Sequence, residues 1–170
     1  MIDKDRAWLD CRNYPDLDPR VERAVRLAGL HFPEDAVAEA HLLEAATLAP
    51  GHEVVLVAYY KYYLYKHRFV DALPYARSCL ELGAERLGVA KDPLQVTAEQ
   101  LGGAAFNEDA RYWMFACQAL GYVYLRAGQV QTGEQLLWHL RAVDVGNQTC
   151  TVELCQVISA AGHDDDDDDD

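Results

Sequence analysis

The chain has 170 residues, of which 51% are hydrophobic, 10% aromatic and 25% charged, a composition typical of a globular protein. Its formal net charge is −13, and the seven aspartates at 164–170 contribute −7 of this, so the remainder carries −6. An acidic chain without a run of Lys or Arg argues against nucleic acid and membrane surfaces as ligands, because both are bound through clustered positive charge. The length also excludes a small scaffold that needs disulfides or metals to hold its core.

The N-terminus and the cysteines predict a cytoplasmic protein. The first residues, MIDKDRAWLDC, lack the basic start and the apolar stretch of a secretory signal. The longest apolar run, 54–60, is too short to span a bilayer. The five cysteines are an odd number without a Cys-x-x-Cys pair, which indicates reduced thiols packed as small hydrophobic residues.

Apolar residues recur at spacings of three and four along most of the chain, which predicts an all-α fold. After an irregular segment at 1–17, Asp18 and Pro19 predict an N-cap and the first turn of a helix that ends near residue 30. A second helix is expected to begin after Pro33 and to stop at the Pro-Gly pair at 50–51. The two form a helical hairpin.

The third and fourth helices are expected at about 52–66 and 70–87. The third is apolar or aromatic on nearly every side, so it must be covered on both flanks. Pro74 falls within about the first turn of the fourth helix, where its missing N–H costs least. The tyrosines that we interpret as core between hairpins are Tyr59, Tyr60 and Tyr63.

Residues 88–107 interrupt the helical pattern with Pro and Gly, and Thr97-x-x-Gln100 has the form of a capping box that opens a short helical piece. The remaining helices are expected at about 107–128, 131–143 and 148–161, the last as a C-terminal cap of a domain that spans 18–162. The poly-Asp tail, 163–170, is predicted to be disordered and solvated, because its charges repel one another.

A repeat of 34 residues relates the second and fourth helices, since Ala38 corresponds to Ala72 and Leu48 to Leu82. A third copy is displaced by the interruption, which adds 27 residues. This period resembles the tetratricopeptide repeat (TPR) family. The matching residues are Pro50 in the first copy, Tyr63, Phe69 and Ala72 in the second, and Leu120, Gly121, Tyr124 and Gly128 in the third. The departures from the family pattern are Gly29 in place of Tyr, Ala84 and Val145 in place of the closing Pro, and Gly133 in place of Ala.

The resemblance implies a small three-repeat protein whose antiparallel hairpins stack as a short right-handed superhelix. In that family the first helix of each pair lines a concave groove. The residues that the resemblance places there are Arg20, Arg23, Lys61, Tyr65, Tyr122 and Arg126. A basic groove rich in tyrosine suits an extended or acidic peptide segment of another protein, because Arg and Lys pair with carboxylates and Tyr offers a rigid contact area.

Catalytic signatures are absent, so we expect no enzyme, no cofactor and no metal. His52-Glu53 opens like the zinc motif His-Glu-x-x-His, but Leu56 stands where the second His is needed. The predicted function is a protein-binding adaptor or chaperone. The alternatives are a dedicated assembly or maturation factor, such as a secretion chaperone or a metalloenzyme accessory protein, and a structural homo-oligomer such as a homodimer.

Overall fold

The computed structural model describes residues 14, 17–102 and 108–161, with side chains as far as residue 156. Within these residues the chain is all-helical, as predicted, and contains no strand. The elements are α2 (Pro19–Leu30), α3 (Asp35–Leu48), α4 (Glu53–Tyr65), α5 (Phe69–Leu87), the 3-10 helix η1 (Pro93–Gln95), α6 (Glu108–Arg126), α7 (Val130–Val143) and α8 (Thr151–Ala161). The poly-Asp tail and most of the N-terminal segment lie outside the described residues.

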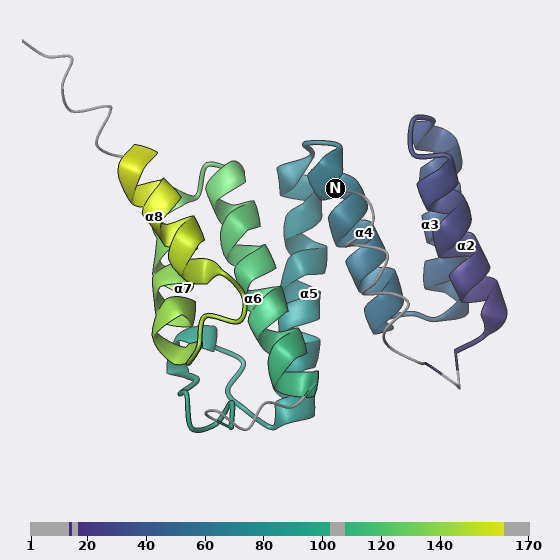
Figure 1. The fold of residues 1–170 in the computed structure, drawn as a ribbon. Coiled ribbons are helices and arrows are strands. Elements are labelled where there is room, and N and C mark those ends of the chain that lie inside the picture. The colour runs from purple at the N-terminus through teal and green to yellow at the C-terminus, as the bar shows by residue number, and fades with distance from the viewer. Residues whose placement is uncertain (1–13, 15–16, 103–107, 162–170) are drawn as a thin grey trace, which may run out of the picture.

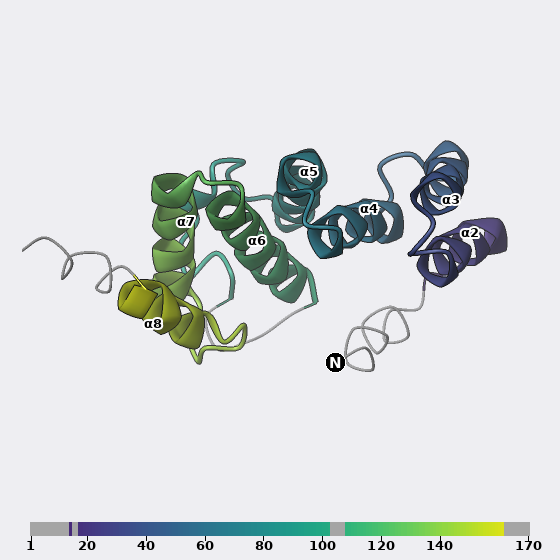
Figure 2. The same ribbon diagram turned by 90° about the horizontal axis from the view of Figure 1, so that it is seen from above.

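Neighbouring helices pack in chain order. α2 lies along α3, α4 along α5, α5 along α6, and α6 along α7, while α8 rests against α7 (Figure 1). Seen from above, the helices form a row in which α3 and α5 lie on one side and α2 and α4 on the other (Figure 2). Positions along this row therefore decide which surface residues can act together.

The predicted start of α2 agrees with the structure, whereas Pro74 lies deeper in its helix than expected. Asp18 caps α2 by accepting a hydrogen bond from the backbone N–H of Arg20 at 2.9 Å, with proline in the first turn as expected. α5 begins at Phe69, one residue earlier than predicted, so Pro74 lies inside the helix. Pro74 is exposed, and water can therefore replace the bond that its missing N–H would have made.

The described part of the connection from α5 to α6, which ends at residue 102, is more ordered than its Pro and Gly content suggests. The capping box at Thr97 forms, with the Thr97 N–H donating to Gln100 Oε1 at 2.9 Å. It closes a turn rather than a helix, and the short helical piece is η1, which Asp92 caps through the N–H of Leu94. Val96 and Leu101 are buried, so the segment is fixed by its own contribution to the core.

The last helix begins at Thr151, three residues after the predicted start. The Asp144 carboxylate accepts hydrogen bonds from the N–H groups of Gln148 and Thr149, each at 3.0 Å, and holds them in a loop. Cys150 then has a φ of 56°, which a continuous α-helix does not allow. Both effects depend on local loop geometry that the apolar spacing does not encode.

The core consists of two clusters that share α4. Val55, Tyr59 and Tyr62 pack toward α2 and α3, whereas Val57 and Tyr60 pack toward α5, α6 and α7. The prediction that this helix is covered on both flanks is confirmed, and so is the core interpretation of Tyr59 and Tyr60, each 7% exposed. The ring of Tyr59 stacks on Tyr75 with centroids 4.4 Å apart.

The buried tyrosines predict a loss of stability at high pH. Burial raises the pKa of Tyr59 and of Tyr62 to about 12, from an ordinary value of 10.0. Their contribution to the free energy of unfolding is complete below pH 10.0 and is lost as the pH rises toward 12, because the unfolded state releases these protons first. We expect Tyr59→Phe/Tyr62→Phe to make this decline shallower in denaturant titrations. A decline identical to that of the wild type would contradict the prediction.

A buried ion pair joins α4 and α5. Glu53 lies in the first turn of α4 and is fully buried, and its carboxylate pairs with the guanidinium of Arg86 near the end of α5. The same guanidinium lies over the ring of Tyr112 on α6, 5.2 Å from its centroid. One pair therefore ties three consecutive helices together.

Candidate functional site

Four of the six residues predicted for the groove lie on α4 and α6, and three aromatic or cationic contacts join them to their neighbours. Lys61 Nζ lies 6.0 Å from the centroid of the Phe115 ring, across the space between α4 and α6. Arg126 stands over the ring of Phe69 at 4.6 Å, and its Nη1 donates to Tyr122 Oη at 2.7 Å. We call this surface the α4–α6 face, and its members are Lys61, Tyr65, Phe69, Phe115, Tyr122 and Arg126.

Helical spacing accounts for the composition of the α4–α6 face. Phe115, Tyr122 and Arg126 are separated by seven and four residues, which places them on one side of α6. Lys61 and Tyr65, four residues apart, share one side of α4 in the same way. Arg111, four residues before Phe115, continues the row toward the start of α6. The surface is thus a strip of aromatic side chains with cations along it.

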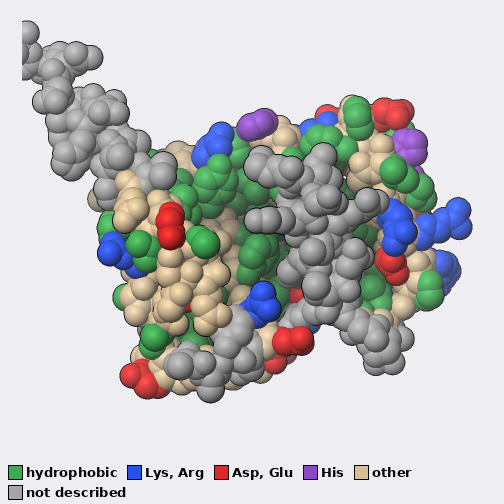
Figure 3. All heavy atoms as spheres, viewed as in Figure 1, with side chains coloured by type: hydrophobic (Ala, Val, Ile, Leu, Met, Phe, Trp, Pro, Cys, Tyr) green, Lys and Arg blue, Asp and Glu red, His purple; other side chains and the backbone are tan. Residues whose placement is uncertain are grey.

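The space-filling view shows this composition. Hydrophobic side chains gather over α6, between α8 and α4, with Lys and Arg side chains above and below them (Figure 3). Gln118, also on α6, borders the strip, and its Nε2 donates to the carbonyl of Thr149 at 2.6 Å. The loop before α8 therefore closes one side of the face.

Arg20 and Arg23 are not brought into the α4–α6 face. Both are on α2, and α4 lies between α2 and α6 in the row of helices (Figure 2). The guanidinium of Arg20 is engaged by the carboxylate that caps its own helix, with Nη2 2.6 Å from Asp18 Oδ2. Arg23 is exposed. These two residues form a separate basic position at the far end of the array.

The sequence reasoning missed Phe69, Phe115 and Arg111. A signal was available for the last two, because they continue the spacing of Tyr122 and Arg126 along one helix. Phe69 had no such signal, since it begins α5 and reaches Arg126 only because the end of α6 lies beside the α4–α5 turn. That proximity is a property of the packing.

Two histidines that could act as a base or a ligand, His52 and His139, have structural contacts instead. The Nδ1 atom of His52 caps α4 by accepting from the N–H of Val54 at 3.2 Å, and burial lowers the pKa of this histidine. His139 Nε2 lies 3.0 Å from the carbonyl oxygen of Val96. Among the described residues, no group of three or more His, Cys, Asp or Glu side chains is placed to hold a metal ion.

The described cysteines are free thiols. Cys79, Cys117 and Cys155 are buried and Cys150 is exposed, while Cys11 lies outside the described residues. Burial raises the pKa of Cys79 to about 12, so this thiol stays protonated at neutral pH.

Among the residues that the structure describes, no helix combines the length and the apolar character that crossing a membrane requires.

The comparisons with known proteins give one match at the level of sequence. The chain is 33% identical over 116 residues to a protein of Azotobacter chroococcum mcd 1 whose name is "Uncharacterized 19.8 kDa protein in nifW 5'region". The match covers 67% of this chain and 65% of that relative. No family model and no solved structure matches the chain.

Proposed function

We propose that this chain is a TPR-type adaptor or chaperone of the cytoplasm that binds a peptide segment of a partner protein on the α4–α6 face. In this proposal the three hairpins form a short right-handed superhelix, and α8 caps its end. The observation that carries the proposal is the strip of cations and aromatic rings that α4 and α6 build together on an otherwise acidic protein. No catalytic step is part of it.

The side chains of the face suit a segment that carries both carboxylates and apolar groups. Arg126 is held between Phe69 and Tyr122, so its guanidinium loses little conformational freedom when it binds a carboxylate. Guanidinium groups pair with carboxylates through two parallel hydrogen bonds. The exposed ring of Tyr65 offers a rigid apolar contact with a polar end. Affinity would come from the rings and orientation from the cations.

The name of the Azotobacter relative favours a narrower form of the same function. That protein is placed in the 5' region of nifW, which suggests a nitrogenase-related context for it. We propose the same context for this chain, with a metalloenzyme component as the partner. This is the accessory-protein alternative of the sequence analysis, and it requires no metal site on the adaptor itself.

The test is recovery of the partner from the native host with two charge-reversed baits. We expect Lys61→Glu/Arg126→Glu to lose the dominant partner, with an affinity for it that is at least about tenfold weaker. Arg20→Glu/Arg23→Glu makes the same change in net charge away from the face and is expected to retain the partner. Mass spectrometry identifies the proteins, and circular dichroism of each bait checks that helix content is unchanged.

Three outcomes would contradict these proposals. Equal recovery with both baits would remove the α4–α6 face as the binding surface. A partner that is neither a metalloenzyme component nor one of its assembly proteins would remove the narrower form. A mass in solution that rises with concentration, with no foreign protein recovered, would favour the homo-oligomer instead.

A further inference from the structure

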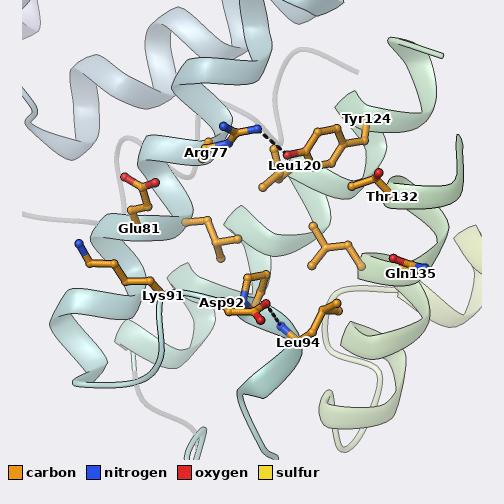
Figure 4. Close-up of a pocket in the computed structure, with 12 residues that line it drawn as sticks. Arg77, Glu81, Lys91, Asp92, Leu94, Leu120, Tyr124, Thr132 and Gln135 are labelled. Carbon is orange, nitrogen blue, oxygen red and sulfur yellow. Dashed lines mark hydrogen bonds between the residues drawn. The ribbon is translucent and has the colours of Figure 1, made fainter. Parts of the chain in front are cut away.

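A concave site, distinct from the α4–α6 face, lies where α5 and α7 meet the connection that leads to α6. Its volume is about 280 Å³. The floor is apolar and consists of Leu80, Leu120 and Leu136, each less than 5% exposed (Figure 4). Pockets for drug-sized ligands measure about 300–1,000 Å³, so this volume fits a small ligand, about the size of a single amino acid.

The wall formed by the connection is held in place without a ligand. Both carboxylate oxygens of Asp92 accept hydrogen bonds, from the N–H of Leu94 at 3.1 Å and from Gln95 Nε2 at 3.0 Å. The carbonyl of Val96 lies 3.0 Å from Nε2 of His139 on α7. The pocket is therefore preformed, which lowers the entropic cost of binding.

Opposite charges face one another across the floor. On one side the Arg77 guanidinium donates to Tyr124 Oη at 2.8 Å, and Asp92 lies on the other side (Figure 4). No ion pair engages Arg77 among the residues that the structure describes, and a guanidinium has five N–H donors, so donors remain for a ligand. Glu81 also lines the pocket, and the amine of Lys91 lies on the Glu81 side and points away from Arg77, Tyr124 and Asp92 (Figure 4).

We propose that this pocket binds a free α-amino acid with an aliphatic side chain. The α-carboxylate accepts from Arg77 and from the hydroxyl of Tyr124, the α-ammonium group faces Asp92, and the side chain lies on the leucine floor. Each carboxylate oxygen of Asp92 has a second lone pair, so the ammonium group does not displace the hydrogen bonds that hold the wall. A ligand with one charge only would leave the opposite wall without its partner, and a larger ligand would exceed the volume.

The experiment titrates L-leucine into the full chain and follows binding by calorimetry and by chemical-shift changes. We expect saturable binding, and binding weaker by about tenfold or more for isocaproate, which lacks the ammonium group, and for isopentylamine, which lacks the carboxylate. Arg77→Met and Asp92→Asn are expected to weaken leucine by a similar factor, and the asparagine keeps an oxygen for the N–H of Leu94. Lys91→Met is the matched control, since it also removes a cation from the lining, and its affinity is expected to stay at the wild-type value.

The proposal is overturned if the wild-type chain shows no saturable response to L-leucine. It is also overturned if either singly charged analogue binds as well as leucine, or if Arg77→Met keeps wild-type affinity. Equal losses in Lys91→Met and Arg77→Met would show a general charge effect and overturn the assigned geometry. Circular dichroism and the thermal midpoint of each variant separate a lost contact from a lost fold.

Discussion

Arg86→Met is expected to lower the free energy of unfolding by about 3–5 kcal/mol, because it leaves the buried carboxylate of Glu53 without its guanidinium. Glu53 is fully buried, whereas the Arg86 side chain is 29% exposed. The change therefore removes the more exposed charge and leaves the buried carboxylate without compensation for its lost hydration. Methionine keeps most of the aliphatic contact that arginine makes. Urea denaturation followed by circular dichroism measures the loss.

A second variant shows whether the charge is the cause. Glu53→Leu/Arg86→Met replaces the pair with apolar groups, and such replacements of buried pairs are often neutral. We therefore expect the double variant to be more stable than Arg86→Met alone. Arg26→Met breaks an exposed pair with Glu22 and is expected to change stability little. A double variant as unstable as the single one would show that packing of Arg86 against Tyr112, rather than the buried charge, explains the effect.

The pair also shows what sequence reasoning misses. The dipeptide at 52–53 resembles the start of a zinc motif, and the sequence does not predict the structural role of either residue. His52 caps α4, which an N-terminal position implies once the helix start is known. The partner of Glu53 lies 33 residues away, and only the packing of α4 on α5 brings the two together. No local sequence pattern can reveal a contact between residues that far apart in the chain.

The fold was more predictable than the candidate site because caps and periodicity are local. Asp18 fixed the start of α2, and the all-round apolar pattern at 52–66 predicted a helix with core on both sides. The α4–α6 face was predicted in part, since the resemblance to the TPR family places Tyr122 and Arg126 in one groove. Phe115 shares the helical spacing of Tyr122 and could have been found, whereas Phe69 meets Arg126 only across a helix junction that the sequence does not reveal.

Gly133→Ala is expected to lower the free energy of unfolding by about 1–3 kcal/mol, although alanine is the better helix former. α6 and α7 approach so closely that a Cβ at Gly133 would lie 2.8 Å from the carbonyl oxygen of Gly121 and 2.8 Å from Leu125 Cγ. The TPR pattern that the sequence resembles has alanine at this position, and here even a methyl group does not fit. Because one obstacle is backbone, relief requires the two helices to separate. Gly29→Ala is the matched control, with no atom within 4 Å of its Cβ, and is expected to be stabilising.

The facing glycine gives a sharper version of the same prediction. A Cβ at Gly121 would lie 2.7 Å from Cγ of Leu137, a fully buried side chain that can be shortened. Leu137→Ala alone is expected to cost about 2–5 kcal/mol through the cavity it leaves. In Gly121→Ala/Leu137→Ala the new methyl group fills part of that cavity, so the double variant should lose less stability than the two single losses combined. Gly133→Ala/Leu137→Ala should gain no such relief, since the clash with the Gly121 carbonyl remains. If the losses of Gly121→Ala and Leu137→Ala were additive, the new methyl group would not be filling the cavity, and α6 and α7 would instead have moved apart. The close approach of the two helices would then not limit the size of the side chain at Gly121.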